Sequence, residues 1–237
     1  MKTLRGSASA ATHRRATLSR QGILEAALAL IDANGLDAFN MRELGIALKA
    51  SPMSVYRHFR DKAELIDAVV DGIVARFVPS EIYKTWQDQA RALSVRVRAS
   101  MLEHPELAFI IGHELRRSPE SLRVNTTIIA RLRITGVPER LLGETYWALS
   151  SYTTGYALLE AQTYRHRRGR VRSQKQRARK LAAMLGAVEG LSENERDEAA
   201  DVMARPLDDR QFLFGLDCVI RGLEQQIGNV RPTRKPR

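Results

Sequence analysis

Polar and basic side chains gather near the N-terminal end of the chain, in the string SPMSVYRHFRDK at positions 51–62. Arginine can bind guanine through two hydrogen bonds, and serine can donate or accept at several base edges, so these residue types suit the major groove of DNA. Tyr56 and Lys62 are better placed for phosphates, since Lys62 falls in a first helical turn, where free N–H groups attract anions. The candidate DNA contacts are Arg42, Ser51, Pro52, Met53, Ser54, Tyr56, Arg57, His58 and Lys62.

Two short helices joined by a tight turn would present these side chains to DNA. A capping pattern predicts a helix over 40–48, and a serine followed by a proline predicts another over 51–59. Val55 and Phe59 lie four residues apart and are expected to face inward, which turns the polar residues of the second helix outward. Packed under a longer amphipathic helix over 19–35, the two form a helix-turn-helix, whose second helix enters the major groove.

The composition excludes several other classes of protein. With 237 residues and 44% hydrophobic content, the chain can bury a core, so disorder of the whole chain is excluded. The single cysteine, Cys218, excludes a disulfide scaffold and a site built from several thiolates. Because the sequence contains neither a membrane-spanning apolar segment nor a secretory signal, we expect a cytoplasmic protein with no membrane partner.

The net charge of +11 is concentrated in three segments. Residues 1–20 carry five basic groups, 165–180 carry nine and 231–237 carry four, and none of these segments contains an acid. Basic segments attract polyanions, but such a run is about as often only a solvated surface. We expect the arginines of the N-terminal arm to meet DNA, and the segment 165–180 to be a solvated connection.

The remaining pattern predicts an all-α fold. Apolar residues recur at three- and four-residue intervals, and prolines stand where helices begin. The charged segment 189–206 is weakly periodic and is expected to be a loop. The further predicted helices cover 61–77, 86–103, a piece from 105, 119–133, 138–162, 174–188 and 207–228.

The string LSRQGILEAALALIDANGLDAFNMRELGIALKASPMSVYRHFRDKAELIDAVV resembles the N-terminal DNA-binding domain of the TetR family of bacterial transcriptional regulators. The resemblance spans about residues 18–78, and its most specific part is SPMSVYRHFRDKAEL. The family usually has glycine where Lys49 stands in the turn, and often glycine at Met53. A left-handed Lys49 would cost about 1 kcal/mol, so a second helix shifted by one residue is the alternative.

The C-terminal part resembles the ligand-binding and dimerisation domain of tetracycline repressors, through WQDQARAL at 86–93, ASMLEHPEL at 99–107 and FLFGLDCVIRGLEQQ at 212–226. That resemblance implies a homodimer and a pocket for a small-molecule effector. Val78 and Ile111 stand where tetracycline repressors carry metal-coordinating histidines, so we expect no metal and no other cofactor. The candidate pocket residues are Met101, His104, Phe109, His113, Trp147 and Tyr152. The candidate dimer-interface residues are Leu149, Tyr156, Phe214, Leu216, Cys218 and Ile220.

The expected organisation is a flexible basic arm at 1–18, a helix-turn-helix domain at 19–78, a ligand-binding and dimerisation domain at 79–230 and a basic tail at 231–237. A two-fold dimer predicts a palindromic operator in double-stranded DNA, and the expected function is a repressor that an effector releases. An effector-independent architectural nucleic-acid-binding protein is the alternative. An enzyme is not expected, because the reactive residues occur without a phosphate-binding loop, a nucleophile elbow or a HExxH motif.

Overall fold

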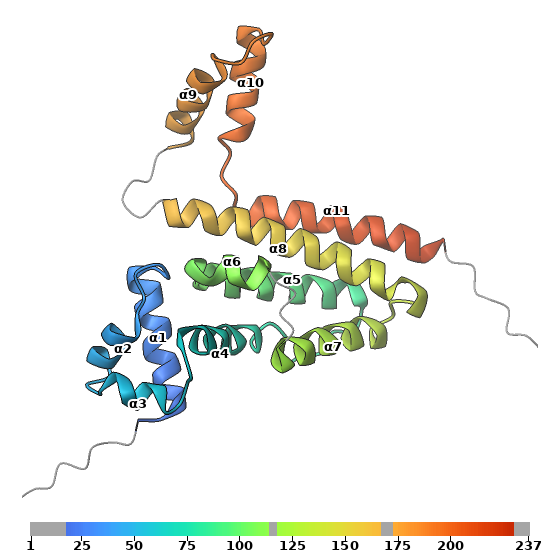
Figure 1. The fold of residues 1–237 in the computed structure, drawn as a ribbon. Coiled ribbons are helices and arrows are strands. Elements are labelled where there is room, and N and C mark those ends of the chain that lie inside the picture. Colours follow the sequence, from blue (N-terminus) through green and yellow to red (C-terminus); the bar gives the residue numbers. More distant parts are fainter. Residues whose placement is uncertain (1–17, 114–117, 167–172, 230–237) are drawn as a thin grey trace, which may run out of the picture.

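Helices make up the fold (Figure 1). The computed structural model describes residues 18–113, 118–166 and 173–229, and no strand occurs within these ranges, which confirms the all-α prediction. The elements are α1 (Arg20–Asn34), α2 (Met41–Ala47), α3 (Pro52–Tyr56), α4 (Lys62–Val74), α5 (Trp86–Glu103), α6 (Pro105–His113), α7 (Pro119–Ile134), the 3-10 turn η1 (Glu139–Leu141), α8 (Leu142–His166), α9 (Gln174–Leu185), α10 (Glu193–Met203) and α11 (Asp209–Gly228).

Side-chain caps begin α2 and α4 where the sequence predicts them, whereas Ser51 at the start of α3 makes no side-chain cap bond. Asn40 Oδ1 accepts the N–H of Glu43 at 3.0 Å, and Asp61 Oδ1 accepts that of Glu64 at 2.8 Å. The Glu64 carboxylate accepts the N–H of Arg60 at 2.8 Å, in place of the N–H of Asp61 that a complete capping box would use. This backbone bond, with a second bond from the Arg60 side chain, lowers the pKa of Glu64.

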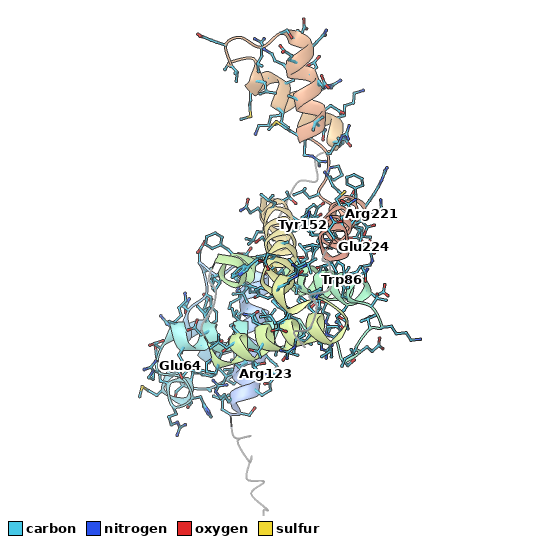
Figure 2. The ribbon with its side chains drawn as sticks, turned by 90° about the vertical axis from the view of Figure 1, so that its right-hand side faces the viewer. Glu64, Trp86, Arg123, Tyr152, Arg221 and Glu224 are labelled. Atoms are coloured by element: carbon cyan, nitrogen blue, oxygen red, sulfur yellow. The ribbon has the colours of Figure 1, made fainter. Side chains whose placement is uncertain are left out.

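The segment 189–206 contains a helix, which corrects the expectation of a loop there. Helix α10 begins with a complete capping box: Ser192 Oγ accepts the Glu195 N–H at 3.3 Å, and Glu195 accepts the Ser192 N–H at 2.8 Å. Helices α9 and α10 lie against each other and stand apart from the other helices in two views (Figures 1 and 2). The apolar periodicity is weak because the buried side of α10 consists of small residues, Ala200 within it and Ala204 after it.

Two clusters of buried apolar side chains form the core. The first contains Val74 at the end of α4, Phe77 directly after it, Met101 of α5 and Leu107 of α6. This cluster also contains the buried residues of α1, α2 and α3, so the core is continuous across the expected domain boundary at residue 78. The second cluster joins α5, α8 and α11. Figure 2 shows Glu64 near the helix-turn-helix end of the molecule, and Tyr152 and Glu224 on the opposite side.

A buried ion pair connects α5 with α8, and an exposed carboxylate of α11 joins it. Arg98 donates to the two carboxylate oxygens of Glu160, each at 2.7 Å, and to Asp209 at 2.8 Å. The side chains of Arg98 and Glu160 are 9% and 2% exposed. Burial acts to lower the pKa of Arg98, but the bonds to Glu160 and Asp209 outweigh it and raise that pKa above its usual value. The guanidinium also lies 4.8 Å from the centre of the Phe212 ring.

Several expectations concern residues outside the described ranges. The expected basic arm falls on residues 1–17 except for its last position, and the tail at 231–237 also lies outside. Within the basic segment 165–180, residues 167–172 lie outside. The residues from 174 onward belong to α9, which confirms the helix predicted from 174 and limits the expected connection to the residues before it. Across the part of the chain that is described, no helix combines the length and apolarity needed to span a bilayer.

Candidate DNA interface and effector pocket

The turn between α2 and α3 has the expected register, and the alternative register shifted by one residue is wrong. The N–H of Ala50 donates to Gly45 O at 2.9 Å, and that of Lys49 donates to Ile46 O at 3.0 Å. Lys49 has a φ of 49°, so this chain makes the left-handed turn with a lysine at a cost of about 1 kcal/mol relative to glycine. Gly45 permits the close turn, because a Cβ there would lie 3.0 Å from the Ala50 carbonyl oxygen.

Helix α3 is shorter than predicted and ends at Tyr56 instead of residue 59. The N–H groups of His58 and Phe59 both donate to Val55 O, at 2.9 and 3.2 Å, and so form a tight last turn. Val55 and Phe59 are 0% and 1% exposed, which confirms that they face inward. The opposite side of α3 therefore faces solvent.

The predicted DNA contacts lie on this solvent-facing side and beside it. Ser54, His58 and Lys62 are half-buried. The exposed members of the set are Arg42, Ser51, Pro52, Met53, Tyr56 and Arg57. No residue of the set is sealed inside the molecule, so all of them can take part in an interface.

A short chain of hydrogen bonds orders the polar face of α3. The hydroxyls of Ser51 and Ser54 lie 3.0 Å apart, and Arg57 Nη2 donates to Ser54 Oγ at 3.2 Å. Two hydroxyls and one guanidinium therefore sit next to one another on the exposed surface. That combination offers both donors and acceptors to base edges, which is what discrimination between base pairs requires.

Lys62 has a contact within the molecule as well as a position suited to phosphate. Its Nζ donates to Phe39 O and lies 5.4 Å from the centre of the Phe39 ring. An ammonium group has three N–H donors, so this contact leaves others for a phosphate oxygen. The first turn of α4 adds free backbone N–H groups at the same place.

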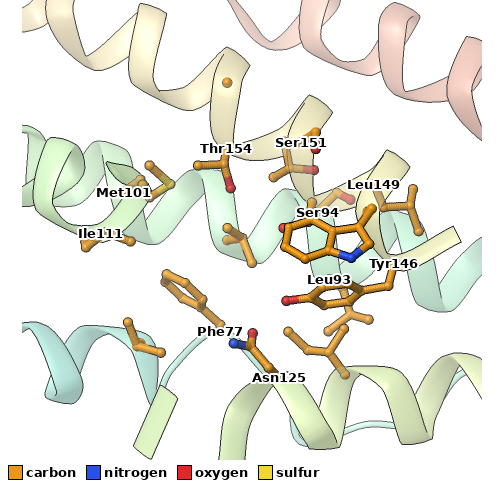
Figure 3. Close-up of a pocket in the computed structure, with 18 of the residues that line it drawn as sticks. Phe77, Leu93, Ser94, Met101, Ile111, Asn125, Tyr146, Leu149, Ser151 and Thr154 are labelled. Carbon is orange, nitrogen blue, oxygen red and sulfur yellow. The ribbon is translucent and has the colours of Figure 1, made fainter. Parts of the chain in front are cut away.

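The helices of the C-terminal part enclose a pocket of about 380 Å³ (Figure 3), a volume within the usual range for small-molecule sites. Its walls come from α5, α6, α7 and α8, together with Val74 of α4 and Phe77 directly after it. Asn125 extends from α7 toward the cavity, opposite Ser151 and Thr154 of α8. All the described residues that line the pocket are apolar or uncharged polar residues.

The polar groups of the pocket are neutral hydrogen-bonding groups. Burial raises the pKa of the Tyr146 phenol, a shift that a hydrogen bond with Ser150 partly opposes, so the phenol stays protonated at neutral pH. Thr153 is 3% exposed, and its hydroxyl oxygen is buried without a hydrogen-bond partner. In the described ranges, no three His, Cys, Asp or Glu side chains group together as a metal site requires.

The structure brings only part of the predicted pocket set together. Met101 and Trp147 line the cavity. His104 instead bonds to Asp32, and Phe109 is 52% exposed outside the lining. Tyr152 also lies outside it, since its hydroxyl donates to Phe212 O at 2.7 Å. The side chain of His113 is outside the described set.

Sequence reasoning missed most of the lining. The missed residues include Phe77, Ser94, Asn125, Tyr146 and Thr153, which come from four separate parts of the chain. Ile111 also lines the pocket. The resemblance to tetracycline repressors pointed to this position, because they carry a metal-coordinating histidine there. An isoleucine cannot coordinate a cation, so that position offers no metal ligand.

The predicted interface set divides into buried and accessible residues. Leu149, Leu216 and Ile220 are 6%, 0% and 3% exposed and belong to the core between α8 and α11, so they are core residues of one protomer. The side chain of Phe214 is 72% exposed, and Cys218 is exposed as well. Phe214 and Cys218 therefore lie on the solvent-facing side of α11, whereas the inward-facing stripe is already covered within the protomer. Tyr156 is half-buried, and its hydroxyl donates to Asp208 O at 3.0 Å.

An exposed helix-turn-helix and a separate ligand-sized pocket define the class: a helix-turn-helix DNA-binding protein with a second, ligand-binding part. Residues 23–69 match the family model for bacterial regulatory proteins of the tetR family, and residues 78–227 match the tetracyclin repressor-like C-terminal domain. The chain belongs to the TetR family of DNA-binding transcriptional regulators, and it is a regulator and not an enzyme.

Individual relatives agree with this assignment. The chain is 26% identical to the class D tetracycline repressor protein of Escherichia coli over 220 residues, which cover 90% of this chain and 92% of the relative. It is 27% identical over 150 residues to an HTH-type transcriptional regulator of Saccharopolyspora erythraea, a match that spans 63% of each protein. The structure of the Streptomyces coelicolor protein ActR in complex with actinorhodin superposes with a TM-score of 0.71 at 27% identity, covering 90% of this chain and 100% of ActR.

Proposed function

We propose that the protein is a repressor that binds a palindromic operator as a homodimer and leaves it when a small molecule enters the pocket. The observation that carries this proposal is the position of α4. The helix begins at Lys62, beside the recognition helix, and ends at Val74, in the wall of the pocket. A ligand that displaces Val74 and Phe77 therefore acts on the same rigid element that positions α3.

The proposed dimer is supported by the apolar surface of α8 and α11, which lie side by side (Figure 1). Leu159 of α8 is 56% exposed, and Leu213 and Phe214 of α11 are 39% and 72% exposed. Pairing across a two-fold axis would bury these side chains in a four-helix contact. Two recognition helices would then meet half-sites about 34–36 Å apart, and the operator is palindromic.

The chemistry of the lining indicates the kind of effector. A charged group would lose its hydration among apolar and neutral residues, so an uncharged molecule fits the described walls best. Phe77, Tyr146 and Trp147 favour a flat ring system. Thr153 and Asn125 favour carbonyl or hydroxyl groups on that ring. ActR, which has been solved with actinorhodin, supports an organic effector here too.

Selection of DNA from a random pool by the purified protein tests the proposal. The expected product is an inverted repeat whose half-sites lie about one helical turn apart. Uncharged ring compounds that raise the melting temperature of the protein are then added to the complex, and at least one is expected to release the DNA. A pool without a common motif would instead support the architectural alternative.

A further inference from the structure

His104 occupies the corner between α5 and α6. Its carbonyl oxygen accepts the N–H groups of Leu107 and Ala108, at 3.0 and 3.1 Å, and so begins α6. Its side chain is 12% exposed and reaches α1, where Nδ1 lies 2.9 Å from Oδ2 of Asp32. One residue therefore holds α6 through its backbone and α1 through its ring.

The end of α1 lies directly against the start of α6. Asp32 is in the last turn of α1, and Gly35 ends that helix with a φ of 90°. A Cβ on Gly35 would lie 3.5 Å from Oε2 of Glu106, in the first turn of α6. The contact between His104 and Asp32 thus sits in a close junction between the helix-turn-helix part and the ligand-binding part.

The same two helices that meet at His104 also form the pocket. Met101, one turn earlier on α5, lines the cavity, as do Ile111 and Gly112 at the far end of α6. Gly112 fits closely against α8, since a Cβ there would lie 2.8 Å from Cδ1 of Leu158. A shift of the pocket wall therefore reaches the His104 corner through a well-seated helix.

The polar contact has a property that the surrounding apolar contacts lack. Apolar packing is non-directional and tolerates small displacements, whereas a hydrogen bond or ion pair weakens steeply when its distance and angle change. The His104 and Asp32 side chains therefore specify one position of α1 relative to α6. Helices α2 and α3 share a core with α1 and α4, so a change in the position of α1 is passed on to them.

We propose that the pair His104 and Asp32 is a positioning contact that holds each recognition helix at the spacing a palindromic operator requires. This inference rests on the proposed function and adds a residue pair that neither lines the pocket nor belongs to the α3 face. Without the pair, each recognition helix still binds its half-site, but a smaller fraction of dimers holds both recognition helices at the required spacing. The apparent affinity for the full operator falls by that fraction.

The test compares binding to the full selected palindrome with binding to a duplex that contains one half-site. Asp32→Ala and His104→Ala remove the contact, and His104→Asn keeps a donor near the position of Nδ1. Asp37→Asn, at an exposed position shortly after α1, is the matched control. Fluorescence anisotropy gives both affinities, and thermal unfolding shows whether each variant is folded.

The expected result is a loss of about tenfold on the full operator for each alanine variant, with half-site affinity changed less than about twofold. A variant that carries both Asp32→Ala and His104→Ala should bind the full operator no more weakly than either single variant. His104→Asn and Asp37→Asn should bind it like the wild type. Equal losses on both duplexes, no loss, or additive losses would overturn the inference. Failure of the proposed function would instead appear in the wild type, as equal affinity for the full operator and the half-site. That result would refute both the proposed function and this inference.

Discussion

Replacement of Glu160 by glutamine should destabilise the protein by about 3 kcal/mol, at the lower end of the usual cost of breaking a buried ion pair. Arg98 would remain charged and buried, having lost the carboxylate that accepts two of its bonds at 2.7 Å. Asp209 is a weak substitute, because its side chain is 86% exposed and its interaction is screened by water. The amide of glutamine can keep one bond, which places the cost near the lower limit.

Thermal and urea unfolding followed by circular dichroism measures this cost. For a chain of this size, about 3 kcal/mol corresponds to a fall in melting temperature of roughly 6–12 °C. Glu120→Gln is the matched control, because Glu120 pairs with Arg123 on the surface, where such pairs contribute less than about 1 kcal/mol. If Glu160→Gln costs no more than Glu120→Gln, the central role of the buried pair is refuted.

Three further predictions concern DNA binding, assembly and pH. Arg57→Ala should weaken DNA binding by about 1–3 kcal/mol and relax the preference at one base position. Lys62→Ala should weaken binding to all sequences alike and reduce the slope of log affinity against log salt concentration by about 0.9. Anisotropy titrations over a salt series compare the two variants. Phe214→Glu should give folded monomers in analytical ultracentrifugation, since this side chain is exposed, and a variant that remains dimeric would exclude this face of α11. The pKa of Glu64 is lowered by its bonds with Arg60. The stability that the Glu64 carboxylate contributes is therefore present above about pH 4.5 and is lost as the pH falls through the pKa of the folded state. Glu64→Gln should remove this part of the acid dependence of the melting temperature.

Local signals in the sequence were sufficient for most helix starts. Asn40 and Asp61 cap α2 and α4 as their spacing predicts, because an N-cap bond spans only three residues and needs no distant partner. The turn at Lys49 also follows from local geometry. The capping box of α10, from Ser192 to Glu195, is equally local. The helix was missed because the charged segment lacks a clear apolar periodicity.

Contacts between distant segments could not be predicted in the same way. His104 meets Asp32 across 72 positions of the chain, and a histidine next to Pro105 gives no sign of that partner. Leu216 and Ile220 show the related difficulty, because an apolar stripe indicates burial but not whether the covering surface belongs to the same protomer or to a second one. The pocket likewise depends on how separate helices meet.

The central claim is that two copies of α3 dock in successive major grooves on one side of a duplex. The most direct measurement compares the selected palindrome with the same palindrome after about five base pairs, half a helical turn, are inserted at its centre. Affinity should fall to that of a single half-site, because the two recognition helices can no longer meet their sites together. Undiminished affinity for the lengthened operator would contradict it.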